Sequence, residues 1–442
     1  MTTKIKNKTV KICVVGIGYV GLPTSILFAE KGFHVTGVDL DEEKINKINK
    51  GISYLEDLDL QKRLERVIKK GRLEATKDTE NAVKKSEVII LTVPTPIKSN
   101  KEPDLSFIIS AGKNVSKGLR KGQIVILEST VYPGVTEEVL GPILEESGLK
   151  MIKDFGLGYC PERYNPGDKK HPIERIDRIF GASDEKTSKM IKKIYQTITK
   201  GEVHQVKNIK TAEAAKVIEN IQRDLNIALV NEFALIFDRL GVDIMDVLKA
   251  ASTKWNFIPY YPGPGVGGHC LPVDPYYLTK KAQEKNYQPK IILAGRKVND
   301  YMPYKVVNLI ESGLKEISIS IKDSKILILG ASYKANTGDY RNSPTRTITK
   351  KLLDSGAKLT IIDPYVKKKE IFECKLKNHV ERDFSEKYDA VVLVVDHKEF
   401  KKLNFRKNLS KKIVFVDCRR IYDPEKLGKD YIYRGIGYGT FN

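Results

Sequence analysis

The stretch that decides the fold is "VKICVVGIGYVGLPTSILFAEKGFHVTGVDLD", residues 10–41. A short apolar run leads into three glycines, a helical pattern follows, and a second apolar run ends at an acid. Two apolar runs of strand length on either side of a helix predict a βαβ unit. Further apolar runs follow at "SEVIILTVP" (86–94) and "GQIVILEST" (122–130). This alternation predicts a parallel, doubly wound α/β sheet.

The glycines of "GIGYVG" have the spacing of a dinucleotide-binding turn. Gly16 allows the tight turn, Gly18 lets the backbone approach a pyrophosphate, and Gly21 lets the helix pack closely on the strand. The helix N-terminus supplies N–H donors for the phosphates. Asp39 ends the next strand, where a carboxylate accepts the ribose hydroxyls and repels a 2′-phosphate. The acids at 41–43 add to that repulsion, so the pattern favours NAD over NADP.

A long amphipathic run occupies residues 211–240 and ends at Gly241. A helix of this length is about 45 Å long, and we expect it to link domains or to pack against a partner subunit. Lys216, Asn220 and Asn231 fall on one face of it. Their spacing fits either a lysine that reaches to water along apolar surface or a fixed cation and amides in a cleft.

The C-terminal third repeats the N-terminal plan. "KDSKILILGASYK" (322–334) opens it, Gly330 corresponds to Gly16, and Asp363 corresponds to Asp39. We therefore predict an α/β protein with two Rossmann-like doubly wound domains joined by a long central helix and a helical middle domain. The predicted boundaries are 1–205 for an NAD-binding domain, 206–310 for the helical domain and 311–442 for the second Rossmann-like domain.

The second glycine turn lacks the GxGxxG spacing and has cations instead. Lys334, Arg341 and Arg346 lie between its strand and the next helix. Solvated surface charge is the ordinary interpretation of such residues. Their place at the predicted switch point of the sheet favours a phosphate or nucleotide site.

Composition limits the other functions. The chain has 442 residues and a formal charge of +21, but its lysines alternate with acids rather than forming one basic block, which does not favour nucleic acid. Its five cysteines have no CxxC spacing, so neither a disulfide framework nor a zinc ribbon is indicated. The apolar runs are too short to span a membrane, and no signal peptide is recognisable. We expect a cytoplasmic protein without nucleic-acid binding, membrane insertion or metal.

Cys270 in "GPGVGGHCLPVD" (263–274) admits three interpretations: a nucleophile, a metal ligand or a buried small hydrophobe. Its neighbour His269 is the only ligand at metal spacing, and we expect adjacent side chains to diverge, which argues against zinc. A thiol peptidase needs a histidine base and a supporting Asn or Asp, and nothing in the sequence identifies them. His171 and His204 are candidates only because they are histidines. Glycines let a backbone approach a ligand, so we interpret Cys270 as a residue presented to a substrate. An NAD domain with such a cysteine suggests oxidation through a covalent thiohemiacetal.

Taken together, several motifs resemble the UDP-glucose/GDP-mannose dehydrogenase family over essentially the whole chain. They are, in order, "GIGYVGLP", "TVPTP", "ESTVYPG", "YCPERYNPGDKKH", "AAKVIENIQRDLNIALVNE", "TKWNFIPYYPGPGVGGHCLPVDPYYL", "ILAGRKVND" and "GASYKANTGDYRNSP". The resemblance implies an NAD-dependent, four-electron oxidation of the C6 alcohol of a nucleotide sugar to a carboxylate, with a UDP-sugar as substrate and a homodimer or larger assembly.

The resemblance also assigns roles. It makes Cys270 the nucleophile, Lys216 and Asn220 the stabilisers of the oxyanion, and Asp274 the group that assists proton transfer and positions water. Beside Lys216 the pKa of the Cys270 thiol is expected to fall. The resemblance gives water-binding and acid/base positions to Thr130 and Glu162. Implied cofactor-binding residues are Gly16, Gly18, Tyr19, Val20, Gly21, Asp39, Pro94, Thr95, Thr130 and Arg341. Implied substrate-binding residues are Glu162, Arg163, Tyr164, Lys216, Asn220, Tyr261, Gly265, His269 and Lys334.

The same motifs favour a UDP-N-acetylhexosamine as the sugar, with UDP-N-acetylglucosamine (UDP-GlcNAc) first. The string "PGPGVGG" also resembles the branch of the family that acts on UDP-N-acetylmannosamine (UDP-ManNAc), which is the alternative. UDP-glucose is less favoured, because its dehydrogenases have a smaller residue at the position of His269.

Overall fold

The computed structural model describes residues 2–55, 58–164, 172–378, 388–403 and 412–439. The chain divides into two compact units. Unit 1 comprises Met1–Glu219 and Tyr276–Tyr287, and unit 2 comprises Asn220–Pro275 and Gln288–Asn442. The three-domain boundaries expected from the sequence stay a prediction.

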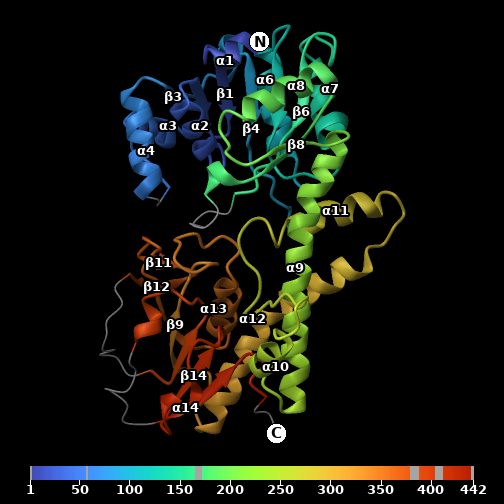
Figure 1. Cartoon of the computed structure of the whole chain (residues 1–442). Helices are drawn as coiled ribbons and strands as arrows, with labels where there is room; N and C mark the ends of the chain where they lie inside the picture. The colour runs from blue at the N-terminus through green and yellow to red at the C-terminus, as the bar shows by residue number, and fades with distance from the viewer. Residues whose placement is uncertain (1, 56–57, 165–171, 379–387, 404–411, 440–442) are drawn as a thin grey trace. The chain divides into compact units, whose positions relative to one another are not determined.

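Unit 1 is built on an eight-stranded sheet with the order β3-β2-β1-β4-β5-β6-β7-β8 (Figure 1). The first six strands in this order are parallel, as in a dinucleotide-binding fold. β6 and β7 pair antiparallel, and β8 is parallel to β7. The strands are β1 Lys11–Val15, β2 His34–Val38, β3 Leu73–Thr76, β4 Val88–Leu91, β5 Ile124–Leu127, β6 Gly156–Tyr159, β7 Arg178–Ala182 and β8 Val203–Gln205.

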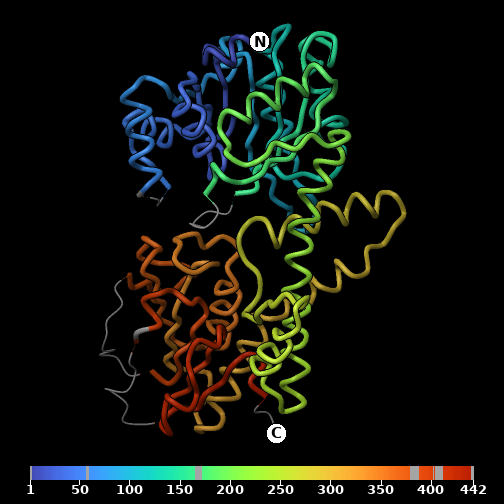
Figure 2. Tube along the Cα trace, viewed as in Figure 1, coloured from blue at the N-terminus to red at the C-terminus, as the bar shows by residue number. Residues whose placement is uncertain are grey.

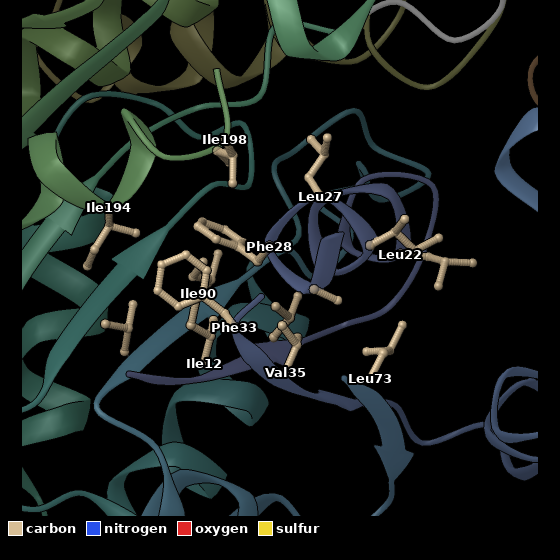
Figure 3. Packing of buried hydrophobic residues seen from close by; sticks show 14 of the residues in the cluster. Ile12, Leu22, Leu27, Phe28, Phe33, Val35, Leu73, Ile90, Ile194 and Ile198 are labelled. Atoms are coloured by element: carbon tan, nitrogen blue, oxygen red, sulfur yellow. The ribbon is translucent and has the colours of Figure 1, made fainter. Parts of the chain in front are cut away.

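Alternating strand residues in unit 1 supply two cores, one on each face of the sheet. In β1, Ile12 and Val14 belong to one core and Cys13 and Val15 to the other. Figure 3 shows the first core, where Phe28 and Phe33 meet edge to face. The α-helices that contribute residues to it are α1 Thr2–Lys6, α2 Gly21–Glu30, α3 Glu42–Asn49, α4 Leu58–Lys69 and α8 Glu185–Tyr195. The other face is covered by α5 Thr79–Lys85, α6 Ser106–Gly118, the π-helix η1 Val135–Leu140, α7 Gly141–Glu145 and the start of α9.

The chain passes between the units along helices. α9, Ile209–Leu240, is a single helix of 32 residues that begins in unit 1 and ends in unit 2 (Figure 2). The chain returns within α11, Asp274–Gln283, whose body belongs to unit 1. There Tyr277 donates through its hydroxyl to the carbonyl of Pro96, at 3.0 Å. The long helix expected at 211–240 is therefore confirmed.

Unit 2 repeats the architecture in a seven-stranded sheet with the order β11-β12-β10-β9-β13-β14-β15. All neighbours are parallel except the short edge strand β11. With the Rossmann-type order of unit 1, this confirms the predicted fold class. The strands are β9 Lys325–Leu329, β10 Lys358–Ile362, β11 Glu370–Ile371, β12 Cys374–Lys377, β13 Ala390–Leu393, β14 Ile413–Asp417 and β15 Tyr431–Gly435.

The helices of unit 2 include a second long one. α12, Lys290–Glu316, packs against the sheet and contains Pro303 in its interior. α10 Ile244–Ala251, α13 Pro344–Asp354 and the short α14 Pro424–Leu427 complete the unit, and α1 Thr2–Lys6 opens unit 1. Among the described residues, none of the helices is both long and apolar enough to cross a membrane.

Candidate active site

The glycine turn of unit 1 has the geometry that its spacing predicts. Gly16 has a φ of +92°, which favours glycine, and a Cβ at Gly21 would lie 2.1 Å from the Gly16 carbonyl oxygen. A Cβ at Gly18, by contrast, would meet nothing within 4 Å. Two glycines therefore serve the turn and the packing of α2, and the third leaves open space where a ligand can approach. No side chain caps the N-terminus of α2 at Val20, and the adjoining Tyr19 is exposed. These residues fit an NAD pyrophosphate.

Asp39 follows β2 at the same end of the sheet. It is half-buried, accepts a hydrogen bond from the Asp41 N–H at 3.1 Å and lies 3.7 Å from the Lys44 ammonium. The neighbouring acids are engaged elsewhere: Asp41 caps α3, and Glu42 pairs with Lys77. The argument for ribose recognition and against a 2′-phosphate therefore rests on Asp39.

The other predicted cofactor residues of unit 1 follow neighbouring parallel strands. Pro94 and Thr95 come after β4, and Thr130 comes after β5. Because the carboxyl ends of β1, β4 and β5 share one edge of the sheet, these residues lie at the same edge as the glycine turn. Glu213 of α9 holds the segment after Thr130, accepting from the Gly134 and Thr136 N–H groups at 2.5 and 2.8 Å. The sequence signal that could have identified Glu213 is its position between two alanines near the start of the long helix.

Glu162 follows β6, where its carboxylate is buried and fully engaged. One oxygen accepts the backbone N–H groups of Arg163 and Tyr164, at 2.7 and 2.8 Å. The other pairs with the buried Arg178 guanidinium at 2.9 Å. Arg163 itself pairs with Glu219 at 2.9 Å, and Tyr164 is half-buried. The acid/base role of Glu162 stays a prediction, and it would use an oxygen that already has a partner. Residues 165–171 of "YCPERYNPGDKKH", including His171, lie outside the described residues.

A second buried acid, Glu128, lies beside this pair and was missed in the sequence. It follows β5 directly, and burial raises its pKa to about 7. The Tyr195 hydroxyl donates to its Oε1 at 2.5 Å, and the Arg178 guanidinium lies over the Tyr195 ring at 5.2 Å. An acid at the very end of an apolar strand was the available signal.

In unit 2, Cys270 lies in the loop between α10 and α11, with its thiol beside an imidazole. The Cys270 Sγ and the His269 Nε2 are 3.5 Å apart. The expectation that these adjacent side chains diverge was therefore wrong, because the irregular backbone of this loop turns both toward one point. The other four cysteines are buried. Within the described ranges, no three His, Cys, Asp or Glu side chains come together in a way that would hold a metal ion.

Asp274 and Asn220 join Cys270 in unit 2. Asp274 is the first residue of α11, and its N–H donates to the Cys270 carbonyl at 2.8 Å. Its buried carboxylate accepts from the Asn220 Nδ2 at 2.5 Å. Lys216 lies one turn before Asn220 on α9, is buried, and belongs to unit 1. The structure thus brings the nucleophile candidate, the acid and the amide together within one unit.

The glycines before Cys270 pack against protein. A Cβ at Gly268, whose φ is +84°, would lie 2.9 Å from the Tyr333 ring. The Gly268 N–H donates to the Arg341 carbonyl at 2.9 Å, and its own carbonyl accepts from the Asn342 side chain at 2.9 Å. These contacts tie the cysteine loop to the segment after β9. Among the other predicted substrate residues, Gly265 is half-buried and Tyr261 is exposed.

Asn231, whose role the helix spacing left open, anchors the start of the cysteine loop. Its Oδ1 accepts the Gly263 N–H at 2.9 Å, and its Nδ2 donates to the Asn299 Oδ1 at 2.9 Å. Asn299 donates in turn to Asp224, which pairs with the buried Arg296 at 2.6 Å. Asn231 is therefore a loop anchor rather than an amide facing a cleft.

The acid that ends β10 differs from its counterpart in unit 1. Asp363 is fully buried, and one oxygen accepts the N–H groups of Ala331 and Ser332 at 2.8 and 2.9 Å. The His397 ring lies 3.1 Å from the same oxygen, and its Nδ1 accepts the Asn336 N–H at 2.9 Å. Asp363 and His397 thereby hold both ends of the segment 331–336.

The predicted cations of unit 2 lie in or next to that segment. Lys334 is half-buried within it, and the exposed Arg341 forms a two-pronged pair with Asp339, with contacts of 2.6 to 3.1 Å. The role of Arg341 at the cofactor phosphates stays a prediction, because it belongs to unit 2 and the glycine turn to unit 1. Arg346 is exposed on α13. His204, a candidate thiol base in the sequence, lies in unit 1 near Asp177 and Glu202.

Three segments of the chain match one family in order. Residues 10–199, 210–301 and 327–424 match the NAD binding domain, the central domain and the UDP binding domain of the UDP-glucose/GDP-mannose dehydrogenase family. A UDP-N-acetyl-D-glucosamine 6-dehydrogenase of Pseudomonas aeruginosa is 41% identical over 423 residues, which are 95% of this chain and 99% of that protein. A UDP-N-acetyl-D-mannosamine dehydrogenase of Pyrococcus horikoshii is 36% identical over 432 residues, or 97% and 99%.

The fold agrees with solved structures of such proteins. The structure of UDP-D-ManNAc dehydrogenase from Pyrococcus horikoshii matches with a TM-score of 0.88 at 35% sequence identity. The match covers 98% of this chain and all of that one.

Proposed function

The chain belongs to the UDP-glucose/GDP-mannose dehydrogenase family, and we propose that it oxidises the C6 hydroxyl of a UDP-N-acetylhexosamine to the carboxylate of the uronic acid. It is an NAD-dependent nucleotide-sugar dehydrogenase. UDP-GlcNAc is the favoured substrate, which the 41% identity to the enzyme of Pseudomonas aeruginosa supports. UDP-ManNAc is the second candidate, favoured by the TM-score of 0.88 to the enzyme of Pyrococcus horikoshii. UDP-glucose is the least favoured.

The observation on which the mechanism rests is the grouping of Cys270, Asp274 and Asn220 in unit 2. After the first oxidation has given the C6 aldehyde, the Cys270 sulfur adds to it, so a thiohemiacetal and then a thioester keep the carbon bound through the second oxidation until hydrolysis. Bound NAD is the hydride acceptor, and four electrons require two NAD per sugar. Asp274 positions water and takes its proton during hydrolysis of the thioester.

Asn220 and Lys216 stabilise the oxyanion that forms when sulfur attacks. An amide NH2 has two donors, so Asn220 can hold Asp274 with one and the oxyanion with the other. Thr130 and Glu162 bind the water network near the reacting carbon, and Lys334 binds the UDP-sugar. The remaining substrate and cofactor residues keep the roles that the family resemblance implies.

We also propose that the protein is a cytoplasmic homodimer formed through α9. Leu229, Phe233, Ile236 and Leu240 recur at intervals of four, three and four residues, and all are exposed. An apolar stripe of this kind on a helix surface indicates a protein partner. The buried face of the same helix packs within its own chain through residues such as Val230 and Ala234.

Counting NADH per sugar tests the reaction. The protein is incubated with NAD and a limiting amount of UDP-GlcNAc, UDP-ManNAc, UDP-GalNAc, UDP-glucose or GDP-mannose, and NADH is measured at completion. We expect two NADH per sugar, fastest with UDP-GlcNAc. Cys270→Ser should stop this yield, because oxygen replaces the tethering sulfur. One NADH per sugar, or full turnover by Cys270→Ser, would contradict the proposal.

A further inference from the structure

We propose that His269 is a catalytic residue, the base that takes the proton of the Cys270 thiol and returns it when the sulfur leaves. This inference rests on the proposed function, since it assigns a role within the same site. It starts from the 3.5 Å between the His269 Nε2 and the Cys270 Sγ, which is a contact to the reacting atom itself.

The backbone on both sides of the pair is fixed, so the contact has a structural basis. Before it, Gly268 exchanges hydrogen bonds with Arg341 and Asn342 of the segment after β9. After it, the Cys270 carbonyl accepts the N–H groups of Val273 and Asp274, at 3.0 and 2.8 Å. The two side chains therefore project from a short loop held at both ends.

Accessibility distinguishes this cysteine from the others. Cys270 is half-buried, and His269 is exposed. Burial raises the pKa of the Cys13 thiol to about 12 and that of the Cys374 thiol to about 11. Those thiols stay protonated at neutral pH. The thiolate is the nucleophilic form, so the one accessible cysteine that has an imidazole beside it is the residue able to react.

The proton transfer balances in both directions. In attack, the Cys270 S–H proton moves to the His269 Nε2, the sulfur electron pair forms the S–C6 bond, and the carbonyl π pair moves to oxygen. In release, water adds to the thioester, the S–C6 bond breaks with its electron pair on sulfur, and the His269 imidazolium returns the proton. Imidazolium and free thiol ordinarily have pKa values of about 6.5 and 8.5, so proton exchange between the two groups is accessible near neutral pH.

Other charged groups are brought to this loop by the elements of unit 2 packed against it. Asp274 lies four residues after the cysteine, and the segment after β9 brings Lys334 and the Arg341–Asp339 pair. Arg419 lies against Gly263 at the start of the loop. Arginine and lysine side chains are ordinarily protonated near neutral pH and so do not act as bases there. Asp274 is assigned to the water that hydrolyses the thioester, and the His269 Nε2 is the nitrogen that lies 3.5 Å from the Cys270 sulfur.

Alkylation of the thiol as a function of pH tests the pair in the full-length protein without substrate. The rate at which iodoacetamide modifies Cys270 is followed from pH 5 to 10 by peptide mass spectrometry. We expect the wild-type protein to be alkylated readily at pH 7, and we expect the rate to fall at lower pH as His269 becomes protonated. His269→Gln should move the profile upward by about one pH unit, a roughly tenfold slower rate at pH 7. His204→Gln, an exposed histidine of unit 1, is the matched control and should follow wild type.

The outcomes separate this inference from the proposed reaction. An unchanged alkylation profile in His269→Gln, with circular dichroism showing a folded protein, would overturn the pair even if wild type still yields two NADH per sugar. A shifted profile with only one NADH per sugar would support the pair and overturn the four-electron reaction. A profile that shifts with Lys216→Met and not with His269→Gln would assign activation to the lysine and refute the role of His269.

Discussion

At the scale of single residues, burial decides the ionisation of Glu128. Its carboxylate is fully buried with one hydrogen bond from Tyr195, and its pKa rises to about 7. A carboxyl whose pKa is raised by folding stabilises the folded state below its unfolded pKa, near 4.5. That stability is lost as pH rises from 4.5 through about 7, because in this range the unfolded state releases the proton while the buried carboxyl keeps it.

Glu128→Gln should remove this loss. The amide oxygen can still accept from Tyr195, and it does not ionise. Between pH 4.5 and 8 the free energy of unfolding of the variant should gain about 3 kcal/mol relative to wild type. Urea unfolding followed by circular dichroism measures this gain. Tryptophan fluorescence is less suitable, because the single tryptophan, Trp255, lies in unit 2 and Glu128 lies in unit 1. Parallel pH profiles for the two proteins would show that folding does not raise the pKa of Glu128.

At the scale of elements, the acids that follow the second strand of each glycine-turn unit have different hydrogen-bonding partners. Asp39 after β2 is only half-buried, whereas Asp363 after β10 is fully buried and binds the N–H groups of Ala331 and Ser332 and the His397 ring. The second sheet therefore uses its acid to shape the segment that contains Lys334. This difference fits a unit that recognises a UDP group rather than a second dinucleotide.

Asp363→Asn should weaken UDP binding and leave NAD binding unchanged. The amide of the variant would turn N–H donors toward backbone N–H groups that need an acceptor, so segment 331–336 loses its anchor. We expect a dissociation constant for UDP roughly tenfold higher by calorimetry, a loss of about 1.4 kcal/mol. Asp354→Asn, an exposed acid of α13, is the charge-matched control. Unaltered UDP affinity in folded Asp363→Asn would refute this role.

At the scale of the whole molecule, α9 has two apolar faces with separate uses. One is buried against its own chain, and the other exposes Leu229, Phe233, Ile236 and Leu240. In the sequence, Leu229 and Ile236 are as apolar as buried positions of the same helix such as Val217, so the amphipathic pattern does not distinguish them. The structure separates them by exposure.

Replacing Leu229 and Phe233 with glutamate should dissociate the proposed dimer, because each chain would bury two charges at the interface. Wild type should sediment as a dimer of the 49.9 kDa chain and the double variant as a monomer. Arg223→Glu changes the charge of α9 at an exposed position off the stripe and should stay dimeric. A monomeric wild type would contradict the proposal.

The sequence by itself determined the fold class, the long helix and the NAD turn. These features depend on local requirements: strands and helices follow apolar periodicity, and the positive φ of Gly16 and the close packing of Gly21 can be met only by glycine. These features can be predicted without knowing which residues lie nearby in the folded protein.

Only the tertiary structure decided how the chemical groups are used. Asp39 and Asp363 occupy the same place in the same pattern, yet a histidine 34 residues downstream turns the second one inward. Likewise Glu162 is engaged by Arg178, and Cys270 meets His269 because a loop anchored by Arg341 and Asn342 directs both side chains. The direction of a side chain in a loop and the identity of a distant partner depend on packing between segments far apart in the chain, which periodicity does not encode.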